Sequence, residues 1–396
     1  MSIKKKCICL FTSFESLNAT YHTQKNLYKY VADQFDKFYI VNVDNLRFFS
    51  KPLDYQFSEE IQSRPKNILL VNLKDSTDFK KFISDKILVV INNFGKTFQD
   101  LKIHLLLKKK DIFQVQFKNI GNIQFDQIVS KKHFLLTAHY LILNRLFRKI
   151  TTILSSLNII NKIDISFISN KQIYERAQKT KLKKFIFTKN FCLVNSKFQD
   201  EIDLSNLSEK YIVHLDYYLD YHAETILRGN MDPNRIKMHH DCVENFLRIA
   251  QRKLNKEVII SIHPQYPIKY FENFYKDFKI VKYKTAELIK DAGLVTFFDS
   301  SAIVNAVLMK KKIIQLSSKY MGINEQYHSE IYRKNLGLSE IEIDNFNEDN
   351  FDEIYQKSNF DKDLLNNYLS NLHLLDNKEK GSVKIVKTIK KKYFSN

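Results

Sequence analysis

Glycine, proline and tryptophan are scarce or missing in this chain of 396 residues, which contains 7 glycines, 5 prolines and no tryptophan. Ordinary globular proteins contain far more glycine and proline than this. The shortage argues against long flexible linkers. It also excludes the glycine-rich loops that hold phosphates in many nucleotide-binding proteins, because no such fingerprint occurs in the sequence. Polar side chains at the ends of predicted strands are therefore the best guide to function.

Cysteine is also rare, with four residues in the chain. Cys7 and Cys9 lie two positions apart on a predicted strand and point the same way, which is a poor geometry for a disulfide. The sequence has no Cys-x-x-Cys pair that would indicate a zinc site. We therefore expect free thiols in a reducing cytoplasm and no zinc knuckle.

Long hydrophobic runs are missing as well. Residues 4–6 are lysines followed by only a short apolar run, which is not the pattern of a signal peptide. The longest uncharged apolar stretch, at 133–144, is too short to span a bilayer. Both observations predict a cytoplasmic location.

The chain carries a strong excess of positive charge, +19 from 63 basic and 44 acidic residues. Only 10 of the basic residues are arginine, whose planar fork suits phosphate and guanine in nucleic-acid recognition. The charge therefore favours other anionic partners, such as phosphates or a membrane surface, over nucleic acid.

Short β-branched runs alternate with helical patterns in the first half of the chain. We predict strands at 7–14, 38–43, 67–73 and 87–93, and helices at 21–34, 78–84 and 97–109. A long helical region at 131–157, a strand at 164–169, a helix near 172–181 and short strands at 185–187 and 191–194 follow. This alternation is typical of parallel βαβ units.

The pattern restarts after a polar stretch at 196–209. We predict strands at 211–215, 257–262, 279–281, 294–298 and 312–316, and helices at 234–254, 270–275, 285–291 and 302–309. An acidic segment at 340–353 and a basic terminal helix complete the chain. The predicted fold class is α/β, with two Rossmann-like domains facing a cleft.

Two predicted strands end in residues with ligand-binding chemistry. The strand at 257–262 is followed by His263 and Pro264, and the strand at 293–298 by Asp299, Ser300 and Ser301. In an open parallel sheet, ligands bind outside the carboxyl ends of the strands. His263 would donate a hydrogen bond to a phosphate or a sugar hydroxyl while Pro264 fixes the loop. The alternative is that His263 only caps its strand.

The serines precede a predicted helix, so they are either ordinary helix caps or part of an anion site. Lys284 and Thr285 begin another predicted helix at the same edge of the sheet. Three such strand ends together predict a cradle for the phosphates and ribose of a nucleotide, to which Asp299 also belongs.

A loop at 216–224 begins with Asp216 and contains three tyrosines, His222 and Glu224. It is either a surface loop packed by its tyrosines or a wall of the site. In the second case Asp216 belongs to the nucleotide cradle, and His222 or Glu224 contacts a sugar as a catalytic candidate.

Residues 210–318 resemble bacterial surface and capsular polysaccharide biosynthesis proteins related in architecture to GT-B glycosyltransferases. The motifs that carry the resemblance are the strand at 211–216, Tyr221-His222, His263-Pro264, the segments 284–288 and 311–314, and Ser300-Ser301. In polysialyl-, Kdo- and related transferases, a His-Pro pair and a serine pair hold the nucleotide part of the donor. The resemblance implies this role for His263, Ser300 and Ser301. The chain departs from the pattern at 222–224, where His-Ala-Glu replaces the expected His-Pro-Asp.

The resemblance also implies roles for the domains. Residues 1–203 would form an N-terminal Rossmann-like acceptor domain, 204–330 a C-terminal Rossmann-like domain that binds the nucleotide sugar, and 331–396 a helical tail. The general base that deprotonates the acceptor hydroxyl would lie in the first domain. Glu15, after the first strand, is the candidate and His22 the reserve; the alternative for Glu15 is a carboxylate in the first turn of a helix.

No acidic residue occurs between positions 127 and 163, where Arg145, Arg148 and Lys149 lie among apolar side chains. This segment is either a buried helix with a basic exposed end or an amphipathic element that rests on anionic lipid. The lysines of the terminal helix would add to the second interpretation.

The sequence thus predicts a cytoplasmic glycosyltransferase, either free in the cytoplasm or peripheral on the inner face of the cytoplasmic membrane. It would move a sugar from a CMP- or UDP-type nucleotide sugar, its donor substrate rather than a cofactor, to a growing surface polysaccharide or lipid-linked glycan. No metal would be needed. The alternatives are a sugar-nucleotide epimerase or glycerophosphate transferase on the same architecture, or a non-catalytic basic protein that binds glycans or nucleic acid.

Overall fold

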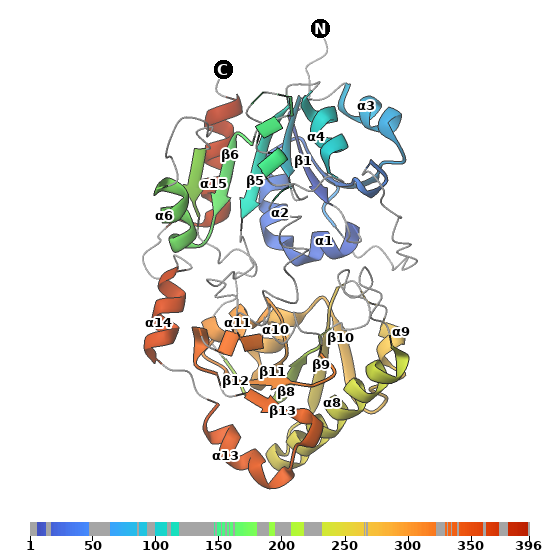
Figure 1. The fold of residues 1–396 in the computed structure, drawn as a ribbon, viewed down its shortest axis with the longest axis vertical. Coiled ribbons are helices and arrows are strands. Elements are labelled where there is room, and N and C mark those ends of the chain that lie inside the picture. Colours follow the sequence, from blue (N-terminus) through green and yellow to red (C-terminus); the bar gives the residue numbers. More distant parts are fainter. Residues whose placement is uncertain are drawn as a thin grey trace. The chain divides into compact units, whose positions relative to one another are not determined.

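The chain forms two compact α/β units in a computed structural model (Figure 1). Unit 1 comprises Met1–Asn122, Phe134–Glu201 and Ser370–Asn396, and unit 2 comprises Ile123–His133 and Ile202–Leu369. The structure describes residues 6–12, 17–46, 64–84, 87–92, 100–108, 112–118, 146, 149–151, 153–154, 157, 159–160, 163–179, 190–194, 207–217, 232–264, 266, 268–321, 329–330, 332–333, 335–338, 340–358, 362–371 and 379–394.

Unit 1 contains a parallel sheet of seven described strands. Their order is β3 (Ile68–Asn72), β2 (Lys37–Asn42), β1 (Lys6–Thr12), β4 (Ile87–Asn92), β5 (Phe113–Lys118), β6 (Ile165–Ile168) and β7 (Asn190–Leu193). The β-branched runs that predicted most of these strands lie in the core because a parallel sheet is covered on both faces. The chain starts in the middle of the sheet, moves to one side through β2 and β3, and returns to the other side at β4.

Helices cover both faces of this sheet. The labelled helices of unit 1 include α1 (Leu17–Thr23), α2 (Lys25–Ala32), α3 (Ser76–Ser84), α4 (Leu101–Lys108), α6 (Lys171–Lys179) and α15 (Gly381–Ile389), with short turns at Asp44–Leu46 and Lys390–Phe394. Buried residues of α2 and α15 pack against one face of β1, and those of α3 and α4 against the other. The single helix predicted at 21–34 is wrong in its bounds, because Gln24 leaves the helical conformation and separates α1 from α2.

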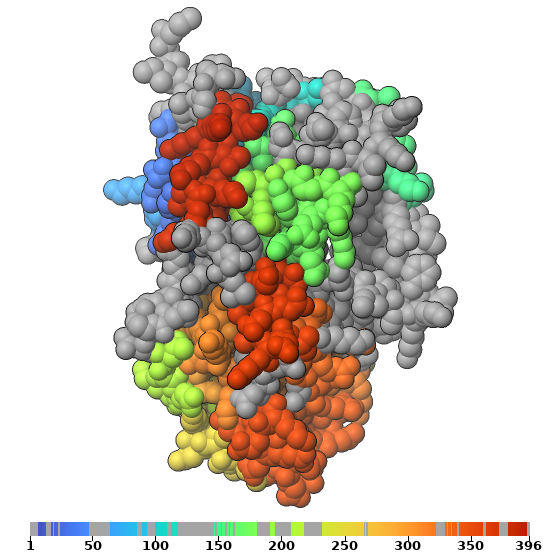
Figure 2. Space-filling model, turned by 90° about the vertical axis from the view of Figure 1, so that its left-hand side faces the viewer, coloured from blue at the N-terminus to red at the C-terminus, as the bar shows by residue number. Residues whose placement is uncertain are grey.

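The basic C-terminal helix belongs to unit 1, beside the N-terminal part of the chain (Figure 2). Ile385, Val386 and Ile389 of α15 are buried in the same cluster as α2. The Cys192 thiol of β7 lies 4.0 Å from the Thr388 hydroxyl. The apolar side of α15 therefore packs in the core of unit 1, and its lysines lie on the outer side of the helix.

Unit 2 contains a second parallel sheet, with six described strands. Their order is β10 (Lys279–Lys282), β9 (Val258–Ile262), β8 (Tyr211–Leu215), β11 (Ala292–Phe297), β12 (Lys312–Ser317) and β13 (Glu340–Glu342). The first strand, β8, again lies inside the sheet. In the sequence of the unit this is the order 3-2-1-4-5-6, the Rossmann arrangement, and its switch point lies between β8 and β11.

The helices of unit 2 also lie on both sides of the sheet. They are α8 (Pro233–Leu254), α9 (Ile268–Phe271), α10 (Thr285–Lys290), α11 (Ile303–Leu308), α13 (Phe351–Gln356) and α14 (Lys362–Asn371), with short turns at Ile343–Asn345 and Glu348–Asn350. One cluster joins buried residues of α8, such as Val243 and Phe246, to Ile212 of β8 and Leu294 of β11.

The long helix α8 has clear sequence signals at both ends. The Asp232 carboxylate accepts a hydrogen bond from the Asn234 amide at 3.0 Å, and Pro233 occupies the first helical position. Asn255 ends the helix in the left-handed conformation with φ of 48°. These signals explain why the helix predicted at 234–254 is confirmed almost to the residue.

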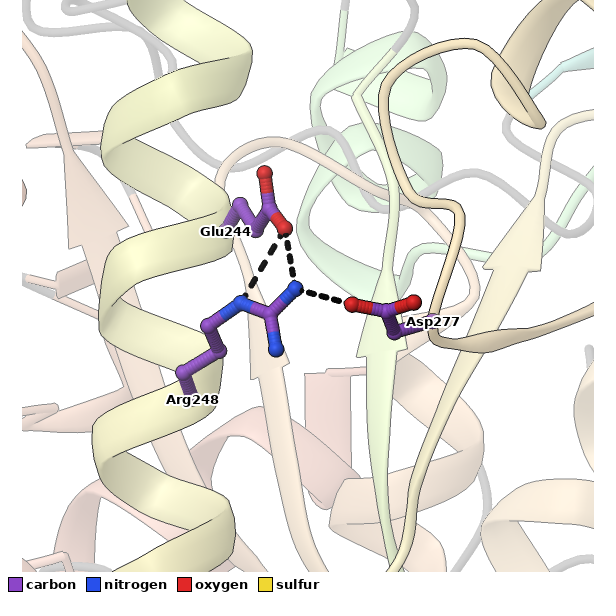
Figure 3. Close-up of polar contacts among 3 residues, drawn as sticks. All are labelled: Glu244, Arg248 and Asp277. Atoms are coloured by element: carbon purple, nitrogen blue, oxygen red, sulfur yellow. Dashed lines mark hydrogen bonds and ion pairs between the residues drawn. The ribbon is translucent and has the colours of Figure 1, made fainter.

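Arg248 ties α8 to the segment that precedes β10 (Figure 3). Its Nη2 donates to Glu244 Oε1 at 2.6 Å and to Asp277 Oδ2 at 2.5 Å. The guanidinium also lies 5.5 Å from the centroid of the Phe278 ring. The hydrogen bonds to Asp277 and Glu244 raise the pKa of Arg248 further. Because Asp277 is exposed and the other two side chains are only partly buried, the network contributes roughly 1 kcal/mol or less to stability.

Candidate functional site in unit 2

The predicted ligand-binding residues of unit 2 do lie at one edge of its sheet. Because all six strands are parallel, their carboxyl ends meet at a single edge. The residues that follow these ends are Asp216 after β8, His263 and Pro264 after β9, Lys284 and Thr285 after β10, and Asp299, Ser300 and Ser301 after β11. The strand order adds one fact that the sequence did not provide: β8 separates β9 from β11, so Asp216 stands between His263 and the serines.

Three contacts hold the loop that carries His263. The Tyr266 amide donates to the His263 carbonyl at 3.1 Å, closing a turn. The ammonium of Lys282, a buried residue at the end of β10, donates to the Tyr266 carbonyl. The Tyr283 hydroxyl donates to the Pro264 carbonyl at 3.4 Å. The half-buried His263 thus lies on a loop whose position is fixed by hydrogen bonds from Lys282 and Tyr283, at the end of β10.

Tyr283 itself has a φ of 66°. A bulky residue in the left-handed region is uncommon and costs of order 1–3 kcal/mol, so it persists only where its surroundings fix it. This residue directly follows β10 and precedes Lys284, at the edge where the ligand would bind. Strain of this kind is often found at binding sites.

The start of α10 is joined to β9 by two hydroxyl groups. Ser261 Oγ and Thr285 Oγ1 are 2.8 Å apart, so this bond fixes the position of Thr285 at the first turn of α10. The neighbouring Lys284 is exposed, and its side chain makes no capping hydrogen bond. An exposed ammonium at this edge is well placed to attract a phosphate.

The serine pair differs from the prediction in one respect. Neither serine is the N-cap of α11, because Ala302 occupies that position. Ser300 Oγ instead accepts a hydrogen bond from the Ala302 amide at 3.3 Å, and the Ser300 and Ser301 carbonyls accept from the amides of Ile303 and Val304. Both serines lie, half-buried, in the turn between β11 and α11. Local hydroxyl–amide bonds of this kind compete with capping, which sequence alone does not resolve.

Side chains of β12 and of a later segment fix the beginning of this turn. The Phe298 carbonyl accepts hydrogen bonds from Gln315 Nε2 at 3.4 Å and from Ser329 Oγ at 3.1 Å. Burial, together with the negative charge of Asp299, raises the pKa of Tyr332 well above its ordinary value. Tyr332 is therefore a neutral phenol close to the Asp299 carboxylate.

A cluster of three buried histidines lies beneath this edge. His214 of β8 is fully buried, and its Nδ1 lies 2.9 Å from the hydroxyl of Thr296 on β11. His239 and His240 of α8 are buried as well, with their ring centroids 5.6 Å apart. Burial, and then the charge of His240, lowers the pKa of His214 to about 3 and that of His239 well below its ordinary value. Both rings are neutral at physiological pH.

A hydrogen-bonded chain runs from this cluster to the strand end of β8. The Tyr275 hydroxyl lies 2.7 Å from His240 Nδ1 and donates to Asp216 Oδ1 at 3.3 Å. The same carboxylate oxygen is 3.9 Å from His214 Nε2. The buried Asp216 is therefore oriented by Tyr275, and it can offer acceptor oxygens at the switch point of the sheet.

This histidine cluster was not predicted from the sequence, although a signal for it exists. His239 precedes Val243, Phe246 and Ala250, all of them buried, at spacings of four, seven and eleven residues. These spacings belong to one face of a helix, so His239 could have been predicted to face the core. That His214 lies opposite depends on how α8 packs on the sheet, which periodicity does not specify.

Several predicted catalytic residues cannot be placed in this constellation. Glu15, His222 and Glu224 lie outside the residues that the structure describes. His22 lies half-buried on α1 of unit 1, with its ring 5.1 Å from that of Tyr21 in an edge-to-face contact. Among the described residues, no group of three His, Cys, Asp or Glu side chains is arranged to hold a metal ion.

Comparison with known proteins identifies the fold. No protein-family profile and no curated protein sequence matches the chain. Among solved structures, UGT89C1 of Arabidopsis thaliana complexed with UDP matches with a TM-score of 0.53 and 10% identity, over 97% of this chain and 98% of that one. A variant of the wall teichoic acid polymerase TagF, soaked with CDPG, matches with a TM-score of 0.50 and 14% identity, over 98% and 89% of the two chains. The chain has a GT-B-like fold. At this level of sequence identity, the similarity shows the fold alone.

Proposed function

We propose that the chain is a glycosyltransferase that moves a sugar from a CMP- or UDP-type nucleotide sugar to an acceptor glycan. The observation that carries this proposal is the convergence of hydroxyl, imidazole, ammonium and carboxylate groups on one edge of unit 2, at the switch point of a Rossmann sheet. That edge is where such sheets bind nucleotides. The acceptor would be a growing bacterial surface polysaccharide or a lipid-linked glycan, bound by unit 1.

In this proposal, unit 2 holds the donor. His263 and the serine pair donate hydrogen bonds to the phosphates, while Lys284 supplies positive charge and Thr285 a further hydroxyl. The two carboxylates of the edge, Asp216 and Asp299, accept hydrogen bonds from ribose or sugar hydroxyls. Because Pro264 has no amide hydrogen, it leaves the loop without a competing donor.

The reaction breaks the bond between the anomeric carbon of the sugar and the nucleotide phosphate, which leaves with the electron pair. The acceptor oxygen forms the new bond to the anomeric carbon, and its proton passes to a general base. Glu15 is the proposed base and His22 the reserve, while His222 and Glu224 are proposed to contact the sugar. Fixed donors aimed at the leaving phosphate stabilise the charge that develops on it. The proposed reaction is metal-independent.

A nucleotide screen tests the donor class. We expect CMP or UDP, added in the presence of EDTA, to raise the thermal unfolding midpoint of the full chain more than GDP does. A ligand present at a hundred times its dissociation constant stabilises the folded state by about 2.7 kcal/mol. If none of these nucleotides shifts the midpoint, unit 2 does not bind a nucleotide and the proposal fails.

Product analysis with the stabilising donor then separates the alternatives. A glycosyltransferase releases nucleotide only as sugar is transferred to an acceptor. A sugar-nucleotide epimerase changes the sugar and keeps the nucleotide attached, and a glycerophosphate transferase moves a phosphate together with its glycerol. A protein that binds a glycan or nucleic acid without catalysis forms none of these products.

A further inference from the structure

The helical segment of unit 1 between residues 146 and 157 exposes apolar side chains. Leu146, Ile150, Ile153 and Leu157 have exposed fractions of 51, 40, 55 and 64%. The described residues from 146 to 154 are helical, and the Leu157 amide donates to the Ile153 carbonyl at 2.8 Å. At 3.6 residues per turn, these four positions fall within an arc of about 60°. The four side chains form one face, the apolar stripe.

The burial pattern of this segment is inverted in part. Thr151 is 4% exposed, while the two leucines and two isoleucines of the apolar stripe are turned outward. A helix on the surface of a globular protein ordinarily buries its apolar side chains and exposes its polar ones. Exposed apolar residues are common singly, but four on one helical face indicate a surface that binds a partner.

The sequence on either side of the apolar stripe indicates what that partner is. The sequence from residue 127 to residue 163 contains no aspartate or glutamate. Six basic residues lie in the same interval: Lys131, Lys132, Arg145, Arg148, Lys149 and Lys162. Lys149 lies one position before Ile150 and is exposed. An apolar helical face accompanied by basic residues alone is the pattern of a helix that lies in the interface of an anionic membrane.

We propose that the apolar stripe is the contact of this protein with an anionic lipid bilayer. The four apolar side chains enter the region between headgroups and acyl chains, and the basic side chains pair with lipid phosphates. The described helices include none that is long and apolar enough to cross a membrane. This contact stands on the stripe and its charges, independently of whether the protein transfers sugar.

A vesicle flotation assay with the full chain tests this proposal. Wild type should float with vesicles of phosphatidylcholine mixed with phosphatidylglycerol, and much less with phosphatidylcholine alone. The variant I150S/I153S/L157S should bind the mixed vesicles at least about tenfold more weakly, because it loses three apolar side chains from the contact. Its folding is checked by circular dichroism.

The chain offers a matched control for the loss of exposed apolar surface. Leu207, Met238 and Ile268 in unit 2 are exposed by 41, 51 and 39%, close to the residues of the apolar stripe. Replacing these three by serine should leave vesicle binding unchanged. A separate variant, R145E/R148E/K149E, should abolish the preference for phosphatidylglycerol, and added salt should weaken wild-type binding because it screens the charges.

Three results would overturn the proposal. The first is equal flotation of wild type and the I150S/I153S/L157S variant. The second is the absence of wild-type binding to either kind of vesicle. The third is self-association of wild type without vesicles, detected by light scattering and abolished by the serine substitutions, which would make the apolar stripe an interface between copies of this chain. Sugar transfer to a soluble acceptor should be unchanged in the variant, so a failure of this proposal is distinguishable from a failure of the proposed function.

Discussion

Replacing Ser300 and Ser301 together by alanine is expected to lower turnover by about 10²- to 10³-fold. This is the usual effect of removing a fixed donor that stabilises charge in a transition state. The two hydroxyls stand at the end of β11, next to the switch point where the leaving phosphate of the donor would lie. Turnover is measured as nucleotide release at saturating donor.

The stability of the same variant separates catalysis from folding. Ser300 Oγ accepts one local hydrogen bond from the Ala302 amide, so its loss should cost about 1 kcal/mol of unfolding free energy. Ser358 provides the control, because its hydroxyl also makes one local hydrogen bond, to the Tyr355 carbonyl at 2.6 Å. It lies away from the candidate site, since its carbonyl accepts from the amide of Ile313 at the amino end of β12. Ser358→Ala should cost similar stability and leave turnover unchanged. If both variants lose activity only in proportion to unfolded protein, the serines are structural alone.

Lowering the pH from 7 to 5 is expected to reduce the unfolding free energy by about 2 kcal/mol through His214 alone. Burial lowers the pKa of His214 to about 3 in the folded state, whereas an unfolded histidine titrates near 6.5. The unfolded chain therefore binds the proton first, and stability that is complete above pH 6.5 is lost as the pH falls towards 3. At pH 5 the difference of about 1.5 pH units corresponds to about 2 kcal/mol. His239 adds to the effect, because its pKa is lowered in the same direction.

Urea unfolding at pH 7 and pH 5, followed by circular dichroism, measures this dependence. The variant His214→Gln retains an amide that can bond Thr296 and cannot titrate, so it should lose a clear part of the pH dependence. An unchanged difference between the two pH values in that variant would show that His214 is not a buried neutral histidine.

Most strands of the two sheets could be predicted from the sequence because they are short β-branched runs between helical patterns. Two strands were missed. β5 carries Gln114 and Gln116, whose polarity hides the strand, yet Gln114 is buried and accepts a hydrogen bond from Asn92 at 3.1 Å. β13 is only three residues long and begins an acidic segment. Inside a sheet, a buried glutamine such as Gln114 can form part of a strand because its side chain is hydrogen-bonded, whereas β13 is an edge strand whose glutamates are exposed.

The residues of the candidate site that follow strands could be predicted from chain order. The residues that reach the site through packing could not. His263 and the serines follow strands, and parallel strands must bring them to one edge. By contrast, Lys282, Tyr283 and Tyr266 shape the His263 loop through backbone carbonyls, a type of contact that leaves no sequence pattern. The chain from His240 through Tyr275 to Asp216 likewise requires α8 to be placed on the sheet.

Calorimetric titration of the stabilising nucleotide into wild type, His263→Ala and Lys210→Ala measures whether the carboxyl edge of unit 2 binds the nucleotide of the donor. Lys210 is the control, because it precedes β8 at the opposite end of the strand and pairs with Asp291 at 3.0 Å. Wild type and Lys210→Ala should bind one nucleotide per chain with equal affinity. His263→Ala should bind more weakly by about 1–3 kcal/mol, the free energy of a hydrogen bond to a charged group. Equal affinity of His263→Ala and wild type would show that the nucleotide does not bind at this edge through His263.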